Sequence, residues 1–539
     1  MKLSRKSLAT FSCLLVFCVF CLIQVATCPI RDTYLNNFDH GYQLGVGIQV
    51  LRGKIPGIDV MVHFGPLVFY SSALWYWLSG SLVGETIACA IAYAACLAVI
   101  YAVVARHASS CFGLLAAAVA YWLEARYYKW YIWLFPLGTL WLLDRVSGSS
   151  PRQRYRWVAA TGFWVGLGWL FRWDVGTTGF LGCLAFFALT QEGKPLVRLR
   201  PPGRTWAVFL LGFAVPLVAW SGYLVLSRGW PGLISYVSVT IEMSLALSRS
   251  MAAPLQPFNL SDPLSPAFLL VVAYVIVPAT YLICGALWLW AECQGRSTRR
   301  STLLLAIALI GGSTAHQALH RRDGAHLLQT IPPAILGASL IVAELRELCS
   351  RKDTVGPRSR VIGSLGPLYA LLVVLVGLSL TPYGRSDLSR FHLWPKQRLR
   401  ELAHPLDAAG GGTVLAALRL VREATDRDDP ILVFPIDSQY YALVDRPVSG
   451  RMTVFVPGVF SSAVDAEENL RAIRQAMPRV VLLSPLITAP DSSPGGKLYS
   501  DIGKSHSYLV KFIKEHYTRR LFESNRVVVL APAEDVSSR

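Results

Sequence analysis

Residues 36–45 read NNFDHGYQLG and residues 58–66 read IDVMVHFGP, with a basic, glycine-containing turn between the two runs. The stretch directly follows the first apolar segment, so the acid Asp39 and the histidines His40 and His63 are expected at a membrane surface. Ionisable groups held at such a surface mark a candidate reaction centre. This loop separates one N-terminal apolar segment from a long series of later ones.

The composition is that of a chain that lies mostly in a membrane. Its 539 residues are 53% hydrophobic and 16% charged, with a mean hydropathy of +0.44, whereas about 25% of a soluble domain is charged. The net charge of +18 does not predict nucleic-acid binding, because the basic residues lie in short segments between apolar runs. All 11 cysteines lie at or before Cys349, and no zinc-site or disulfide spacing appears.

The apolar runs predict about eleven membrane-spanning helices. The first, from Leu8 to about Cys28, follows three basic residues and is predicted to be an uncleaved signal anchor, with a cleaved signal peptide as the alternative. Residues 60–80 are ambiguous, because counting them as a span moves every later loop to the other side. The remaining spans are expected at residues 84–106, 108–124, 130–144, 157–171, 175–191, 206–227, 265–291, 302–319, 327–345 and 361–380.

The basic loops resolve this ambiguity through the positive-inside rule. If residues 60–80 form a juxtamembrane helix, all four strongly basic loops lie on the side of the N-terminus. These loops carry Arg145, Arg152, Arg154 and Arg156; Lys194, Arg198, Arg200 and Arg204; Arg296, Arg299 and Arg300; and Arg346, Arg351, Lys352, Arg358 and Arg360. We therefore expect an inner (plasma) membrane protein with a cytoplasmic N-terminus and an extracytoplasmic C-terminus.

Under that topology four polar segments converge on the outer face. They are the loop with Asp39 and residues 124–129 (EARYYK), 172–174 (RWD) and 316–326 (HQALHRRDGAH). Arg321, Arg322 and Asp323 at the centre of a span would together cost roughly 8–10 kcal/mol. These segments are therefore expected at the interface or in a water-filled cavity.

The chain after about residue 383 has the composition of a soluble domain. Helices are expected at residues 415–425, 466–477 and about 508–517, and strands at 431–434, 480–483 and 527–530. Alternating strands and helices predict a small α/β domain. The predicted organisation is a membrane domain over 1–383, with an outer loop at 29–83, and an extracytoplasmic domain over 384–539.

This layout resembles the GT-C superfamily of integral-membrane glycosyltransferases, especially the bacterial group related to the protein O-mannosyltransferases and the lipid A sugar transferases. The resemblance rests on Asp39, Gly41 and the sequence GPL at 65–67 in the first outer loop, and on the segments 172–176 (RWDVG) and 322–326 (RDGAH). It covers about the first 380 residues and is architectural beyond them. It implies a membrane glycosyltransferase that uses a polyprenyl-phosphate-linked sugar as donor.

Transfer of a sugar to an acceptor hydroxyl needs a base and cations. Asp39 is the candidate base, because a partly desolvated carboxylate can take the hydroxyl proton. A leaving lipid phosphate is stabilised by cations, and the guanidinium fork suits its oxygens. The residues predicted to bind the donor phosphate are Arg321, Arg322, His326 and Arg172. The supporting residues are His40, Arg126, Lys129, Asp174, His316, His320 and Asp323. A single base without a covalent intermediate predicts inversion of the anomeric centre.

Each of these residues also has a simpler interpretation. Asp39 could cap the helix that follows it, as an Asp before an apolar periodic run often does. Arg172 and Asp174 could form an ion pair at the end of a span. His40 and His63 could be structural.

The histidines of the 316–326 segment also suggest a divalent-metal site. His316 and His320 are four residues apart and share one helical face, but spacing fixes no third ligand beside His326. The metal therefore stays undetermined and no cofactor is assigned. Residues 426–428 match a D-x-D pattern in the wrong context, a polar turn before a strand, and are set aside.

Two other functions remain open on the sequence: a transporter or flippase of lipid-linked glycans, and a non-catalytic receptor or assembly protein with an outer binding domain. A transporter is expected to have charged or broken spans near the bilayer midplane, and the sequence has few. The expected partners are the lipid-linked donor, an undetermined acceptor (glycan, lipid or protein) and membrane lipids.

Overall fold

The computed structural model describes residues 5–27, 38–124, 127–190, 203–250, 266–320, 323–350, 403, 406, 412–457, 462–488 and 496–533. The chain forms two compact units. Unit 1 comprises Met1–Cys28, Ile87–Ser221 and Ala252–His392. Unit 2 comprises Pro29–Thr86, Gly222–Met251 and Leu393–Arg539.

Unit 1 is a helical bundle. Its helices are α1 (Arg5–Thr27), α5 (Leu82–His107) from Ile87 onward, α6 (Ser110–Trp122), α7 (Trp130–Ser147), α8 (Pro151–Phe171), α9 (Trp173–Leu189), the first part of α10 (Gly203–Ser250), α11 (Pro266–Cys293), α12 (Arg299–Thr314), α13 (His316–His320) and α14 (Gly324–Ser350). The first turn of α5 belongs to unit 2. Every predicted span coincides with a helix except residues 361–380, which lie outside the described residues.

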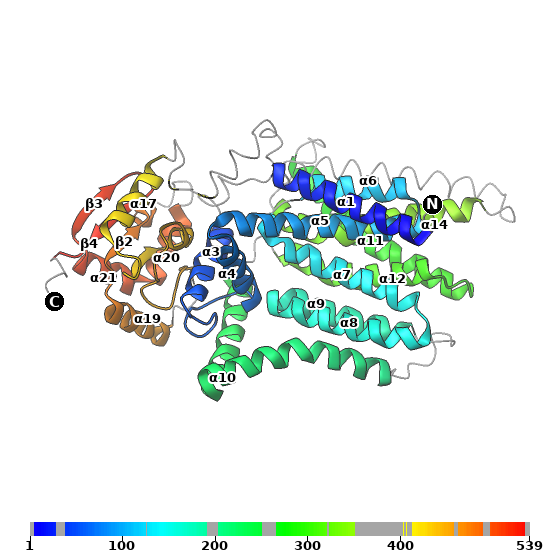
Figure 1. The fold of residues 1–539 in the computed structure, drawn as a ribbon, viewed down its shortest axis with the longest axis horizontal. Coiled ribbons are helices and arrows are strands. Elements are labelled where there is room, and N and C mark those ends of the chain that lie inside the picture. The colour runs from blue at the N-terminus through cyan, green and yellow to red at the C-terminus, as the bar shows by residue number, and fades with distance from the viewer. Residues whose placement is uncertain are drawn as a thin grey trace. The chain divides into compact units, whose positions relative to one another are not determined.

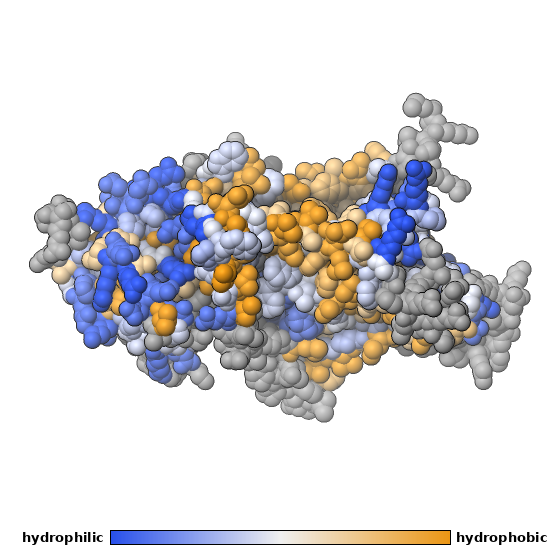
Figure 2. Space-filling view, turned by 90° about the horizontal axis from the view of Figure 1, so that it is seen from below, coloured by the Kyte–Doolittle hydropathy of each residue, from blue (hydrophilic) through white to orange (hydrophobic). Residues whose placement is uncertain are grey.

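Several of these helices are long and apolar enough to cross a membrane. Among the described residues there are five, at Leu82–His107, Gly203–Glu242, Leu270–Cys293, Arg299–Leu319 and Gly324–Glu347. Shorter apolar helices lie at Thr10–Val25, Ser110–Trp122 and Trp173–Leu189. On the face shown in Figure 2, hydrophobic residues gather over the middle of the bundle. The chain is a multi-pass membrane protein, and the number of spans and the sides of the termini stay predictions.

Helix α7 lies between α8 and α12, and α12 also packs against α9, α11 and α14 (Figure 1). Helices α8 and α10 approach each other closely because glycines line their contact. A Cβ atom on Gly162 would lie 2.1 Å from the Phe209 carbonyl oxygen, and one on Gly166 would lie 2.5 Å from the Phe213 carbonyl oxygen. Small residues allow this approach in membrane bundles, where burial of apolar surface between helices gains little over contact with lipid.

Helix α10 is two helices joined at Gly229. This glycine has φ 69° and ψ −176°, a conformation that side-chain-bearing residues rarely adopt. The predicted span at 206–227 corresponds to the first helix and ends just before this break. The helix after Gly229 was not predicted, and it belongs to unit 2.

Unit 2 contains a four-stranded sheet in the order β1-β2-β4-β3. Strand β1 (Ile431–Phe434) pairs in parallel with β2 (Val480–Leu483), and β4 (Val528–Ala531) pairs antiparallel with both β2 and β3 (Arg519–Glu523). The accompanying helices are α17 (Gly412–Ala424), α18 (Gln439–Val444), α19 (Ala463–Ala476), α20 (Gly496–Ser505) and α21 (Ser507–His516). The predicted α/β domain is confirmed, whereas α18, α20 and β3 were not predicted.

Unit 2 also contains α3 (Phe38–Leu51) and α4 (Pro66–Ser79). Helix α4 falls in the ambiguous stretch 60–80. With 14 residues it is about 21 Å long, which is too short to cross a hydrocarbon core of about 30 Å. This length agrees with a juxtamembrane helix.

Helix α3 packs between α4 and α18. A Cβ atom on Gly45 would lie 2.4 Å from the Ser438 carbonyl oxygen, so the two backbones are in direct contact. One turn on, Gln49 donates to the Arg446 carbonyl oxygen (3.1 Å) and accepts from the Val448 N–H (3.0 Å). The segment with α3 and α4 and the C-terminal α/β fold therefore share one packed core.

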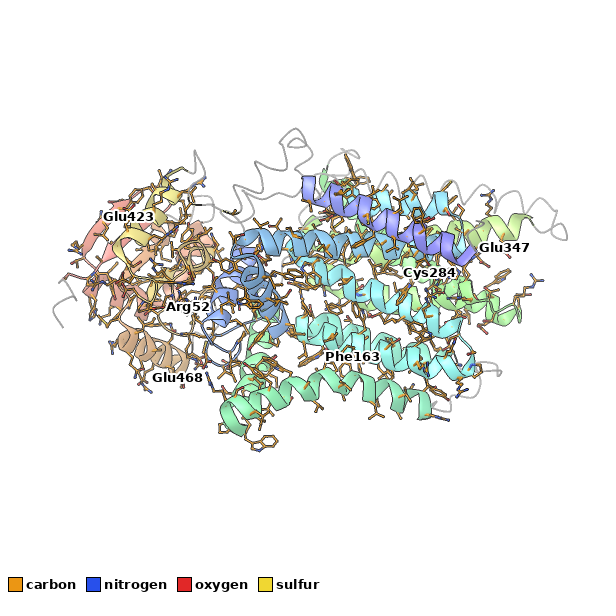
Figure 3. All side chains as sticks on the ribbon, viewed as in Figure 1. Arg52, Phe163, Cys284, Glu347, Glu423 and Glu468 are labelled. Atoms are coloured by element: carbon orange, nitrogen blue, oxygen red, sulfur yellow. The ribbon has the colours of Figure 1, made fainter. Side chains whose placement is uncertain are left out.

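Arg52 continues this contact at the end of α3. Its guanidinium group lies 3.1 Å from the carboxylates of both Asp428 and Asp445 (Figure 3).

Gly45→Val is expected to destabilise unit 2 by about 1–3 kcal/mol, because added methyl groups force α3 and α18 apart. Hydrogen exchange of the full-length protein in detergent measures this as faster exchange of the α3 and α18 amides. Gly222→Ala is the control, because nothing lies within 4 Å of its added Cβ. Equal protection of these amides in Gly45→Val and the wild type would contradict the close packing.

Candidate functional site

Asp39 lies in the first turn of α3 and is half-buried. The N-terminal end of a helix favours a carboxylate, because the first backbone N–H groups carry partial positive charge. One turn further, Tyr42 is buried, and its hydroxyl accepts from the His63 N–H (3.0 Å). Burial, and to a smaller extent the charge of Asp39, raises the pKa of the Tyr42 phenol. The His63 ring stacks on Tyr42 with centroids 4.5 Å apart.

His40 is fully buried and is held by a carboxylate that the sequence analysis missed. Its Nε2 lies 3.0 Å from Oε2 of Glu85, in the first turn of α5. The Ser72 hydroxyl donates to Oε1 of the same carboxylate (2.7 Å). The network links α3, α4 and the start of α5 and fixes the helix that carries Asp39. His40 therefore helps to hold α3 in place.

Another carboxylate of unit 2, Asp437, follows strand β1. The Gln439 side chain donates to it (3.3 Å) and also lies against α3, where a Cβ on Gly41 would be 2.3 Å from Gln439 Oε1. Burial raises the pKa of Asp437 to about 6, and the Gln439 hydrogen bond opposes this shift. Asp437 can therefore change charge near neutral pH.

In unit 1, Arg172 and Asp174 form an ion pair at the junction of α8 and α9. Arg172 Nε lies 2.8 Å from Asp174 Oδ1, and both side chains are largely buried. Gln317 of α13 donates to the other oxygen of Asp174 (3.2 Å). The structure thus shows the ion pair that the sequence suggested. Gln317 connects this pair to the 316–326 segment.

His326 lies in the first turn of α14, where Asp323 accepts hydrogen bonds from both its backbone N–H and its ring Nδ1 (2.8 Å each). The Tyr274 hydroxyl of α11 donates to the Asp323 carbonyl oxygen (3.1 Å) and the Ala318 carbonyl oxygen (3.2 Å). This tyrosine was also missed by the sequence analysis. His326 is buried and held in one orientation by the carboxylate.

Glu124 and residues 128–130 lie at the same end of unit 1. Trp130, at the start of α7, packs edge-on against Phe171, the residue before Arg172, with ring centroids 5.3 Å apart. Lys129 is buried with its amine 5.8 Å from the Tyr128 ring centroid. Glu124 is also buried and accepts a hydrogen bond from Gln24 of α1.

Three of the four predicted polar segments therefore meet at one end of the unit 1 bundle, and the fourth, with Asp39, belongs to unit 2. Arg126, Arg321 and Arg322 and the side chain of His320 lie outside the described part of the chain. The His316 ring, at the start of α13, bonds to the Ser313 carbonyl oxygen at the end of α12 (2.7 Å). Among the described residues, no three His, Cys, Asp or Glu side chains gather as metal ligands.

Neither protein-family models nor curated proteins match this sequence. The fold of the chain does match those of solved structures. ArnT from Cupriavidus metallidurans bound to undecaprenyl phosphate is 13% identical, with 96% of this chain and 97% of that chain covered and a TM-score of 0.52. An Archaeoglobus fulgidus oligosaccharyltransferase in complex with Zn and sulfate is 11% identical, with 96% and 73% covered and a TM-score of 0.48.

The chain has the GT-C glycosyltransferase fold. The fold predicted from the resemblance of the loop at 36–66 and the segments at 172–176 and 322–326 is thereby confirmed. The roles of the individual residues in this GT-C fold stay predictions.

Glu85→Leu is expected to destabilise the protein by about 3 kcal/mol, because it removes the carboxylate that buried His40 and Ser72 bind. Glu85→Gln retains a hydrogen-bonding side chain and is expected to lose less stability. Thermal unfolding of the purified protein in detergent compares the two variants. A Glu85→Leu protein as stable as the wild type would show that the network does not hold α3.

Asp437→Asn is expected to stabilise unit 2 at pH 7 by up to about 3 kcal/mol. The folded-state pKa lies above the ordinary 3.8, so the stability linked to the protonated carboxyl is present below about pH 4 and lost as the pH rises through about 6. The difference in unfolding midpoint between variant and wild type should therefore vanish near pH 4. Asp428→Asn, at a carboxylate that is 93% exposed, is the control and should change the midpoint little at either pH.

Proposed function

We propose that the protein is a membrane glycosyltransferase that moves a sugar from a polyprenyl-phosphate-linked donor to an acceptor hydroxyl on the extracytoplasmic face of the inner membrane. The observation that carries the proposal is a GT-C fold in which three separate polar segments meet at one end of a helical bundle. The structural neighbour ArnT was solved with undecaprenyl phosphate, which supports a lipid phosphate as the carrier.

In the proposed reaction Asp39 accepts the proton of the acceptor hydroxyl as its oxygen attacks the anomeric carbon. The bond from that carbon to the phosphate oxygen breaks, and the lipid phosphate leaves with the electron pair. Arg172, Arg321, Arg322 and His326 are assigned to the phosphate, where cations held in place lower the barrier to charge separation. One displacement inverts the anomeric centre.

Two features of unit 2 support Asp39 as the base. Its helix is anchored by the His40–Glu85 contact, so the carboxylate has a defined position. It is also half-buried, one turn before the buried Tyr42, so it lies at a position partly shielded from solvent.

Arg172 has a defined position for a different reason. Asp174 holds its Nε, so the guanidinium plane is oriented before a ligand arrives. Preorganised cations act on a leaving phosphate without first paying the cost of ordering a flexible side chain.

Asp39→Asn is expected to lower the turnover of a labelled polyprenyl-phosphate sugar about 10²–10⁴-fold, because the amide cannot take the proton. Membranes that contain the protein are incubated with a set of radiolabelled polyprenyl-phosphate sugars, and transfer is followed by the appearance of labelled acceptor. Asp428→Asn serves as the charge-matched control in the same unit. Full turnover by Asp39→Asn at equal protein levels would exclude Asp39 as the base.

The same assay separates the alternative functions. A flippase moves the intact labelled donor across proteoliposomes containing the purified protein and leaves the sugar on its carrier. A receptor neither moves nor cleaves it. Absence of transfer with every donor, together with donor translocation, would replace the glycosyltransferase proposal.

A further inference from the structure

The other end of the unit 1 bundle holds a basic cluster, built from Asp144, Arg106, Arg299, His107 and Arg145. Asp144 is fully buried, and Arg299 bonds it twice, through Nε and Nη2 (2.8 Å each). His107 Nε2 lies 2.9 Å from the same carboxylate, and Arg106 donates to it as well. One carboxylate thus joins α5, α7 and α12.

This basic cluster carries more positive than negative charge. Arg145 lies near Arg106 and Arg299 but pairs with no carboxylate among the described residues, and its buried Nε has no hydrogen-bond partner. Its guanidinium carbon instead sits 5.0 Å from the Trp141 ring centroid. Arg106 and Arg299 share the carboxylate of Asp144, and both side chains are about one-third exposed. With Arg145, the cluster holds three guanidinium groups and one carboxylate.

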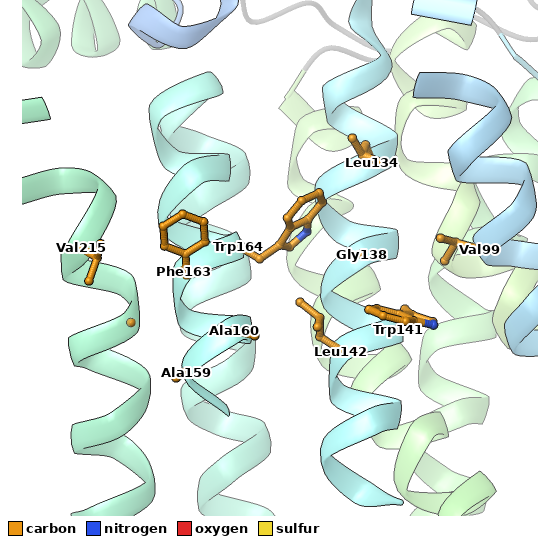
Figure 4. Close-up of a pocket in the computed structure, with 11 residues that line it drawn as sticks. Val99, Leu134, Gly138, Trp141, Leu142, Ala159, Ala160, Phe163, Trp164 and Val215 are labelled. Carbon is orange, nitrogen blue, oxygen red and sulfur yellow. The ribbon is translucent and has the colours of Figure 1, made fainter. Parts of the chain in front are cut away.

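An apolar groove of about 650 Å³ lies between α5, α7, α8 and α10 (Figure 4). Its volume is within the 300–1,000 Å³ that is usual for ligand sites. Its lining includes Val99, Leu134, Trp141, Phe163, Trp164 and Val215 and contains no charged residue. The small residues Gly138 and Ala160 leave space between the larger side chains.

The groove leads to the basic cluster along two helices. On α7, Leu134, Gly138, Trp141 and Arg145 recur at the spacing of one helical face. On α5, Val99 and Arg106 are seven residues apart and share a face in the same way. Trp141 belongs to both features, because it lines the groove and carries the Arg145 guanidinium group.

We propose that the groove and the basic cluster bind one anionic phospholipid, with an acyl chain in the groove and the phosphate at Arg145, Arg106 and Arg299. The excess positive charge favours an anionic over a zwitterionic headgroup. An arginine without a carboxylate partner is stabilised most by an ion pair with a phosphate. Free phosphate has no acyl chain, so the apolar groove would not strengthen its binding. The site lies at the opposite end of α8 from Arg172, so it is separate from the proposed catalytic residues.

Native mass spectrometry of the full-length protein in detergent tests this proposal with phosphatidylglycerol and phosphatidylcholine of identical acyl chains. We expect the wild type to retain phosphatidylglycerol preferentially. Arg145→Gln is expected to weaken this retention about fivefold, the effect of removing one basic residue from an anionic lipid surface. Ala160→Leu, which places a larger side chain in the groove, should reduce retention without changing charge.

Arg296→Gln is the matched control, because Arg296 is exposed in the turn before α12 and its loss changes the net charge equally. Retention of phosphatidylglycerol should be unchanged in this variant. Equal retention of both lipids by the wild type would overturn the proposal, even if Arg145→Gln does not fold. Unchanged retention in Ala160→Leu, or displacement by equimolar undecaprenyl phosphate, would also overturn it.

Discussion

The position of Asp39 depends on how closely the backbone of α3 can approach its neighbours. Gly41 and Gly45 have no side chains that would hold α3 away from residues 438–439. The helix therefore packs directly against the segment that follows β1. On another side, buried His40 is tied to Glu85. A buried ionisable pair tolerates little displacement, because a charge that loses its partner in the interior is costly. Packing and pairing together leave α3 a single position.

Much of the fold could be predicted because it depends on local patterns. The membrane helices of unit 1 appear as apolar runs, and strands 431–434 and 480–483 appear as short apolar segments bounded by polar ones. Strand 519–523 was not predicted, because its sequence RRLFE is largely polar and exposed. It becomes a strand through its pairing with β4, which the local pattern does not encode.

The site could be predicted only in part, for a related reason. The sequence identified ionisable residues in an apolar context, but it did not identify their partners, such as Gln317 for Asp174, which lie 143 positions apart. Gln49 and Arg446 are 397 positions apart. The sequence could have indicated that Glu85 is a paired acid, because an acid at the start of an apolar run requires a partner. No single-sequence pattern indicates which residue that partner is.

Charge balance distinguishes the two ends of the unit 1 bundle. At the end with Arg172, two carboxylates each bind one basic side chain: Asp174 holds Arg172, and Asp323 holds His326. These pairs are preorganised but close to neutral, so the proposed leaving phosphate, which departs as a dianion, requires positive charge from neighbouring basic residues. The adjacent sequence supplies Arg321 and Arg322. At the other end three arginines outnumber one aspartate. This excess of positive charge favours the proposed binding of an anionic lipid, which involves no catalytic step.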